Sequence, residues 1–353
     1  AKRKRLMQSA LEIAKECEAW DAAPHQIAEQ AVALFQGHAV RPADLTNVEA
    51  EIFGSATAGG IYTRFAALDD LIAPMLPGQL IVVGARKKVG KTPMMMRIAD
   101  DLARQGIGVG FISLELTPTE MEQRYLCSLA DVSLHTIQAR NWNVAEGTRI
   151  EKAWTERKDL PLQIRGAGRW TTARLRATAT EMKRRHGIGC LIVDQLSWLD
   201  VAKSRDKFDR IGQAVGEVKA LAQDLGIPIV LASQLNRGAE PESYMGPGSV
   251  RRPSSQHLYG ADEIAQTADV VLLVHRPEKM LASIEPPRDA EVRGKALHPQ
   301  WSVEMERWRG KAELIAVDRR SGPEGAREVG FTANRLWFHP LHSRQPEQEA
   351  LEL

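Results

Sequence analysis

Cysteines, aromatic residues and long apolar runs are all scarce in this chain of 353 residues. The three cysteines, Cys17, Cys127 and Cys190, are far apart and form no C-x-x-C pair, which argues against a zinc site and against a disulfide framework. No apolar run is long enough to cross a membrane, and the basic start at residues 2–5 is not followed by the apolar core of a signal peptide. We therefore expect a cytoplasmic protein without a membrane segment, whose cysteines are reduced and buried.

An excess of charge of either sign is also lacking. The chain carries 47 basic and 45 acidic residues, which gives a net charge of +2. This balance excludes no class of partner, because a basic nucleic-acid groove can lie on a nearly neutral protein. The apolar (43%) and charged (26%) fractions are those of an ordinary soluble protein, and the length allows one large α/β domain with a small appendage.

The pattern of the chain changes near residue 63. Apolar spacing of three and four over residues 6–35 predicts two short helices joined by a turn, and we assign residues 1–36 to this helical hairpin. Residues 37–62 are rich in Pro, Thr, Ser, Ala and Gly and are interpreted as a linker. We assign residues 63–340 to one α/β domain and residues 341–353 to a polar tail.

Short β-rich runs alternate with helical patterns in the α/β domain. This alternation predicts a mostly parallel sheet flanked by helices. Later runs predict an antiparallel ribbon with a turn at residues 321–323, and residues 237–256 and 277 to about 301 are expected to be mobile loops. The predicted strands are 80–83, 108–114, 162–165, 191–193, 229–233 and 270–275, the predicted helices are 94–104, 118–130, 171–185 and 211–225, and the ribbon comprises 312–317, 328–332 and 336–338.

The most informative stretch runs from residue 79 to residue 92, where an apolar strand leads into a Gly-Lys-Thr turn and then a helix. Backbone N–H groups and a helix N-terminus then point at one spot, which suits a polyphosphate. In such a loop Lys91 reaches the β- and γ-phosphates, and the Thr92 hydroxyl binds Mg²⁺. Ala85 departs from the pattern G-x-x-x-x-G-K-[ST], whose first position is glycine. The candidate phosphate-binding residues are Ala85, Arg86, Lys87, Lys88, Val89, Gly90, Lys91 and Thr92.

Three other predicted strands end in a polar residue that would lie near this loop. Asp194 follows an apolar strand as a Walker B acid does and would complete the Mg²⁺ site opposite Thr92, although an acid can also simply cap a strand. Glu115 would face the γ-phosphate and polarise the attacking water, or it is an ordinary surface glutamate. Gln234 would sense the γ-phosphate without adding charge, or it is structural.

These blocks follow one another in the order found in DnaB-type replicative DNA helicases, which the chain resembles from about residue 62 to residue 338. That family also has alanine at the position of Ala85. The blocks that carry the resemblance are residues 64–69, 77–78, 86–92, 113–115, 194, 233–237, 268–269 and 320–323.

The resemblance implies a RecA-like P-loop ATPase core in a hexameric ring, with ATP and Mg²⁺ held between subunits and single-stranded DNA in the central channel. It also implies roles for individual residues. Lys91 and Thr92 hold phosphate and Mg²⁺, Asp194 is the Walker B acid, Glu115 the catalytic base, Gln234 the γ-phosphate sensor, Arg124 a nucleotide contact and Arg320 an arginine finger given to the neighbouring subunit's ATP.

The chain departs from the family in two places. Asp318 stands where the family usually has a lysine that reaches the γ-phosphate, and residues 257–262 differ from the family's DNA-contacting loop. Arg237 matches a DNA-contacting position of the family. Arg251 and Arg252 are further candidates for contacts with DNA phosphates, with an exposed charge pair as the alternative.

The expected function is that of an ATP-dependent DNA helicase motor of DNA replication, with single-stranded DNA, other copies of the chain and a primase or helicase loader as partners. Two alternatives stay open: a RecA-like recombinase or remodelling ATPase, and a nucleotide-binding scaffold with weak hydrolysis. Residues 1–36 resemble the last helical hairpin of the family's N-terminal domain. Because most of that domain is absent, the chain is expected to be either a fragment or a shortened helicase.

Overall fold

The computed structural model describes residues 60–201, 207–236, 238, 241–292, 294–320 and 324–341. The chain divides between Ala58 and Gly59, and the described residues all belong to the second unit. Outside them lie the predicted hairpin (1–36), most of the linker (37–62), Cys17, Arg237, the turn at 321–323 and nearly all of the tail.

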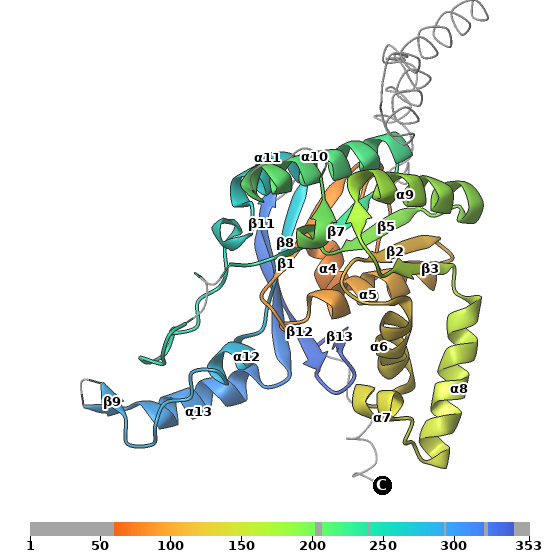
Figure 1. Cartoon of the computed structure of the whole chain (residues 1–353). Coiled ribbons are helices and arrows are strands. Elements are labelled where there is room, and N and C mark those ends of the chain that lie inside the picture. The colour runs from red at the N-terminus through yellow and green to blue at the C-terminus, as the bar shows by residue number, and fades with distance from the viewer. Residues whose placement is uncertain are drawn as a thin grey trace, which may run out of the picture. The chain divides into compact units, whose positions relative to one another are not determined.

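A nine-stranded sheet forms the centre of the described residues (Figure 1). All pairs from β8 across to β3 are parallel, whereas β8–β11, β11–β12 and β12–β13 are antiparallel. The predicted mostly parallel sheet is confirmed, and so is the antiparallel ribbon. In spatial order the strands are β13 (Trp337–His339), β12 (Gly325–Thr332), β11 (Lys311–Arg319), β8 (Val270–His275), β1 (Leu80–Ala85), β7 (Ile229–Gln234), β5 (Cys190–Asp194), β2 (Val109–Ser113) and β3 (Leu162–Gly166).

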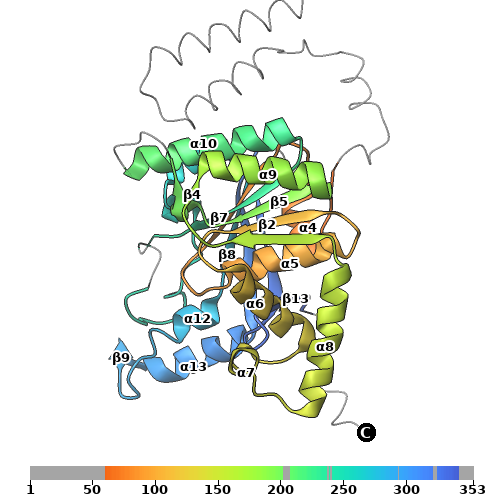
Figure 2. The ribbon, with the colours of Figure 1, turned by 45° about the vertical axis from the view of Figure 1, so that its right-hand side comes forward.

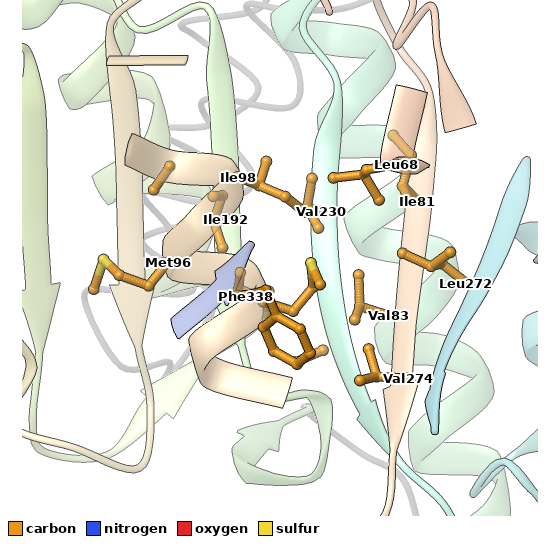
Figure 3. Packing of buried hydrophobic residues seen from close by; sticks show 14 of the residues in the cluster. Leu68, Ile81, Val83, Met96, Ile98, Ile192, Val230, Leu272, Val274 and Phe338 are labelled. Carbon is orange, nitrogen blue, oxygen red and sulfur yellow. The ribbon is translucent and has the colours of Figure 1, made fainter. Parts of the chain in front are cut away.

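The central strand β1 shows why the sheet is covered on both faces. All of its residues are buried. Leu80 and Val82 belong to one apolar cluster and Ile81 and Val83 to another, because successive side chains of a strand point to opposite faces. Figure 3 shows Ile81 and Val83 within the second of these clusters. Strands that are apolar on both faces are typical of parallel sheets packed between helices.

Helices supply the outer layers on both faces. In Figures 1 and 2, α9 and α10 run side by side over one face. Leu175, Val215 and Ile264 join these helices to the cluster around Leu80. The helices of this face are α9 (Thr172–His186), α10 (Lys207–Leu225) and α11 (Ala261–Thr267), and those that pack on the cluster around Ile81 are α4 (Ala66–Ile72), α5 (Lys91–Ala103) and α6 (Pro118–Ala130).

Capping residues define the start of one predicted helix, α6, and the end of another, α9. At the start of α6 the Thr117 hydroxyl accepts the Glu120 N–H at 3.2 Å, while the Glu120 carboxylate accepts the Thr117 N–H at 2.9 Å. This reciprocal capping box, followed by Pro118 in the first turn, begins the helix where the sequence predicts it. Helix α9 ends at Gly187, whose φ of 60° is the left-handed conformation that glycine adopts without strain.

Two helices that the sequence patterns do not delimit follow α6: α7 (Leu134–Ala139) and α8 (Val144–Asp159). Both are mostly polar, and they bury a small separate cluster that includes Cys127. Cys127 and Cys190 are buried free thiols, as expected. Burial raises the pKa of Cys127 to about 11 and that of Cys190 to about 12.

The prediction of a mobile loop from residue 277 to about 301 is wrong. This stretch contains α12 (Pro277–Leu281), a hairpin of β9 (Glu291–Val292) and β10 (Lys295–Ala296), and the start of α13 (Leu297–Trp308). Apolar residues along α13 explain the fold, because Leu297, Trp301, Met305 and Trp308 recur at helical spacing and pack in one cluster with α12. The described part of the other predicted loop, 237–256, contains no α-helix or β-strand.

Candidate nucleotide site

The predicted phosphate-binding loop connects the end of β1 to the start of α5. Lys88 (φ 63°) and Gly90 (φ 124°) adopt left-handed conformations in this turn. A Cβ at Gly90 would also lie 3.1 Å from Cζ of Phe338, so both the backbone and the space favour glycine there. Helix α5 begins at Lys91, and its first N–H groups therefore face the loop.

Ala85 does not disturb this turn. It is the last residue of β1, pairs with Gln234 and Val274, and is buried. The glycine that the fold needs is Gly84, where a Cβ would come within 2.6 Å of Leu273 and 2.7 Å of Leu258. The departure from the phosphate-loop pattern is therefore a packing matter in the strand and leaves the phosphate cradle intact.

Lys91 and Thr92 meet the end of β5 at the same edge of the sheet. The Thr92 hydroxyl donates to Oδ2 of Asp194 at 2.5 Å. The Lys91 ammonium donates to the side-chain oxygen of Gln195. Sequence reasoning missed Gln195, and its only signal is that it directly follows the strand-end acid Asp194.

Burial opposes the charges of both Lys91 and Asp194. Burial lowers the pKa of Lys91, and the nearby carboxylates of Asp194 and Glu115 counteract this effect. Burial raises the pKa of Asp194, which the Lys91 charge and the Thr92 hydrogen bond counteract. Each of the two charges therefore favours ionisation of the other.

The donor set at Asp194 fits Mg²⁺. Oδ1 of Asp194 is buried and has no hydrogen-bond partner among the described residues, and Oδ2 binds the hydroxyl of Thr92. Carboxylate and hydroxyl oxygens are the hard ligands that Mg²⁺ takes from proteins, with waters and phosphate oxygens completing its shell. Thr92 and Asp194 would hold the ion at this point.

Glu115 and Gln234 lie at the same edge of the sheet as the loop. β2 pairs with β5 so that Ser113 stands opposite Asp194, and the exposed Glu115 follows two residues later. Its charge acts on both Lys91 and Asp194. Gln234 is the last residue of β7, directly beside Ala85. The structure thus brings together the polar strand ends that the sequence singles out.

Arg124 approaches the site from α6. It lines a small pocket at the start of α5, and its Nε is buried without a hydrogen-bond partner among the described residues. Its positive charge also acts on Asp194. An unpartnered guanidinium N–H beside the phosphate loop suits an anionic ligand. The pocket is lined by Thr92, Pro93, Met96, Met121, Arg124, Ser128 and Leu336.

Arg320 lies at the opposite edge of the sheet. Its neighbour Arg319 pairs with Val270, the first residue of β8, whereas Ala85 pairs with Val274 near the end of that strand. Val270 and Val274 are four residues apart on β8, which is roughly 13 Å at about 3.3 Å per residue. Nη2 of Arg320 donates to the Gln266 carbonyl at 2.6 Å, and its side chain is 54% exposed. Arg320 is therefore not brought to the Lys91 site of its own chain.

Asp318 and the two loop arginines occupy different surroundings. Oδ2 of Asp318 is buried without a hydrogen-bond partner among the described residues. Arg251 is exposed. Arg252 forms an ion pair with Glu313, with 2.5 Å between Nη2 and Oε1, and Glu313 is buried. This partner of Arg252 is a structural contact that the sequence does not reveal.

A comparison with models of protein families finds a match that covers most of the chain. The sequence model of the DnaB-like helicase C terminal domain matches residues 60–339. The chain belongs to this family. The DnaB-family core in this chain therefore coincides with the described sheet and its helices.

Two curated relatives illustrate the match. The replicative DNA helicase DnaB of Treponema pallidum (strain Nichols) is 30% identical over 301 residues, which cover 84% of this chain and 59% of that protein. The replicative DNA helicase DnaB of Rickettsia bellii (strain RML369-C) is 26% identical over 303 residues, which cover 81% of this chain and 59% of that protein. The chain thus spans little more than half the length of these DnaB relatives.

Solved structures share the fold. One that is described as an ATPase domain superposes with a TM-score of 0.68 at 21% identity, covering 84% of this chain and 97% of that one. A DnaB-like replicative helicase, described with its interactions with primase, gives a TM-score of 0.73 at 21% identity and covers 97% of this chain and 76% of that one. The expected RecA-like ATPase fold is confirmed.

In the described residues of this DnaB-family chain, no helix is long and apolar enough to cross a membrane.

Proposed function

We propose that the chain is the motor of an ATP-dependent DNA helicase of replication, which hydrolyses ATP at the subunit interfaces of a ring and moves along single-stranded DNA. The observation that carries the proposal is the separation of the charged groups. Lys91, Thr92 and Asp194 meet at one edge of the sheet, and Arg320 stands at the other. A site that needs all of them is complete only when a second copy contributes its Arg320.

The side chains at the Lys91 edge suit the parts of such a reaction. When bound, ATP supplies the phosphoanhydride that is cleaved, and Mg²⁺ neutralises phosphate charge. Lys91 and Arg124 would bind phosphate oxygens, while Thr92 and Asp194 would hold the ion. Glu115 is exposed at the mouth of the site and would accept the proton of the attacking water at its carboxylate.

The remaining roles complete the motor. Gln234, beside the loop, would orient the water and sense the γ-phosphate, and Arg320 of a neighbouring copy would stabilise the developing negative charge. Arg237, Arg251 and Arg252 are the proposed DNA contacts. A hexamer acting with a primase or helicase loader in the cytoplasm completes the proposal. The family match favours this motor over a recombinase or a non-hydrolysing scaffold.

The boundaries of the proposed ATPase domain are residues 63–340. Residues 1–36 are proposed to form a helical hairpin, residues 37–62 a linker, and residues 341–353 a polar tail. The family match over residues 60–339 supports the limits of the ATPase domain.

Mixed assemblies test the division of the site between subunits. Glu115→Gln and Arg320→Ala chains should each be inactive alone, because each lacks one half of the site. Mixing them creates some interfaces with both Glu115 and Arg320, so ATPase activity should reappear and should be stimulated by single-stranded DNA. If mixing restores no activity, the site is not shared between subunits. If DNA does not affect the ATPase rate at any salt concentration, the chain does not move along DNA.

Unwinding of a forked DNA duplex by the wild-type chain is the direct assay of the proposed activity. Lys91→Ala provides the control that should neither bind ATP nor unwind DNA.

A further inference from the structure

A second short sheet lies beside the nucleotide site. β4 (Trp170–Thr171) pairs in parallel with β6 (Leu199–Asp200), so that Trp170 stands opposite Leu199. Trp170 and Leu199 are 3% and 2% exposed and point into the core. Arg169 and Trp198 directly precede the two strands, Trp198 as the last residue of a 3₁₀ turn, and both side chains are exposed to solvent.

Trp198 is 56% exposed, which is unusual for the largest apolar side chain. Together with Arg169, Arg174 and Asp200 it forms a surface that we call the β4–β6 platform. The Arg169 side chain is 84% exposed, and its Nε lies 2.6 Å from Oδ2 of Asp200, so the one acid of the platform is already paired. Arg174 lies over the Trp170 ring at 4.2 Å and donates to the Arg169 carbonyl at 2.6 Å.

The chemistry of the β4–β6 platform is specific. An exposed aromatic ring flanked by arginines suits single-stranded nucleic acid, because the ring stacks on a base and the guanidinium groups attract phosphates. A duplex offers no free base face for such stacking. A protein partner would leave the excess positive charge without a matching group unless that partner were acidic.

The platform is directly connected to the phosphate site. Gln195, which accepts from the Lys91 ammonium, precedes the 3₁₀ turn Leu196–Trp198, and its carbonyl accepts the Trp198 N–H at 3.2 Å. The turn that presents Trp198 therefore starts at the residue that binds Lys91. A phosphate that binds Lys91 competes with Gln195 for the same ammonium protons.

We propose that Trp198 stacks on a base of single-stranded DNA and that Arg169 contacts the adjoining phosphate. This subsite rests on the proposed helicase function and adds a base contact to the phosphate contacts of Arg237, Arg251 and Arg252. Gln195 links it to Lys91, so phosphate binding at Lys91 changes the grip on the base.

Binding of two labelled oligonucleotides to the full chain, with a non-hydrolysable ATP analogue, tests the stacking. One is a deoxythymidine oligomer and the other has the same length but abasic sites. Trp198→Ala should weaken binding of the first by about fivefold to 150-fold, the range for one base–aromatic stack, and leave binding of the second almost unchanged. Trp198→Phe should retain most of the affinity.

Trp154→Ala is the matched control, because Trp154 is 42% exposed on α8, which Figure 2 shows well apart from β4. It should bind both oligonucleotides like the wild-type chain. Arg169→Ala should reduce the dependence of log affinity on log salt by about one unit of slope, as expected for one phosphate contact.

Several results would overturn the proposal that Trp198 stacks on a base. The first is an equal loss on both oligonucleotides in Trp198→Ala, and the second is the same loss in Trp154→Ala. The third is dissociation of the assembly by Trp198→Ala in analytical ultracentrifugation, which would make the surface a subunit interface. A wild-type chain that binds no single-stranded DNA at all would overturn the proposed function itself, whereas wild-type binding that Trp198→Ala leaves unchanged would overturn only the stacking.

Discussion

Replacing Arg252 with alanine tests whether this arginine stabilises the fold through its ion pair with Glu313. Nη2 of Arg252 lies 2.5 Å from Oε1 of Glu313, and its Nε donates to both carboxylate oxygens at 3.1 and 3.2 Å. The Glu313 side chain is only 3% exposed, whereas that of Arg252 is 62% exposed. Arg252→Ala would therefore leave a buried carboxylate without its cation.

The size of the effect follows from this asymmetric burial. Removing one partner of a fully buried ion pair destabilises a protein by about 3–5 kcal/mol. Since solvent reaches Arg252, we expect a loss of about 2 kcal/mol. Thermal unfolding should show it as a midpoint lower by roughly 4 °C or more, because 1 kcal/mol corresponds to about 2–4 °C in domains of this size class.

Arg251→Ala is the matched control, since Arg251 is the exposed neighbour in the same loop. It should leave the midpoint almost unchanged. Arg252→Ala combined with Glu313→Gln should recover part of the loss, because the unpaired charge is then gone. If Arg252→Ala and Arg251→Ala unfold within about 0.5 kcal/mol of each other, Glu313 does not depend on Arg252, and the ion-pair argument is wrong.

Four other variants test three separate parts of the structure. Arg320→Ala should lower the ATPase rate by about 10³-fold while nucleotide binding, measured with a fluorescent analogue, is retained; a rate near that of the wild type would exclude an arginine finger. Ala85→Gly should leave the ATPase rate unchanged, and a lower rate would show that the phosphate loop depends on Ala85. Gly84→Ala should lower the free energy of unfolding in urea by about 1–3 kcal/mol, and an unchanged value would contradict the packing argument. Burial, then the charges of Arg86 and Arg252, lowers the pKa of His275 to about 4. Between about pH 6.5 and 4 the unfolded chain therefore binds more protons at His275 than the folded chain does, so the thermal unfolding midpoint should decrease as the pH is lowered through this range. If the midpoint of His275→Gln decreases as steeply as that of the wild type, His275 is not the cause of this pH dependence.

Much of the candidate nucleotide site could be predicted from the sequence, because its residues follow short apolar strands. In a parallel sheet the carboxyl ends of strands share one edge, so Glu115, Asp194 and Gln234 were expected beside Lys91. β8 and α6 have the bounds that the sequence predicts, since β8 is apolar up to its last residue, His275, and α6 starts with a capping box. Local signals of this kind need no knowledge of tertiary packing.

Contacts between distant segments could not be predicted in the same way. Arg252 and Glu313 are 61 residues apart, and Gln195 is 104 residues from Lys91. Helix α13 was missed because its apolar spacing starts inside a stretch of prolines and charges and becomes informative only when α12 packs against it. The β4–β6 platform depends on a pairing of two-residue strands, which are too short to leave a periodic pattern.

The placement of Lys91 and Arg320 at opposite edges of the sheet has a consequence for how copies assemble. If Arg320 completes the neighbouring site in the proposed ring, each copy gives its Arg320 to one neighbour and receives an arginine at its Lys91 site from the other, which is head-to-tail association. Head-to-tail association is directional, so an open assembly ends with one Lys91 site that lacks its arginine and one Arg320 that has no site. Closing the ring joins these two ends, and activity per chain should therefore decrease on dilution more steeply than nucleotide binding does.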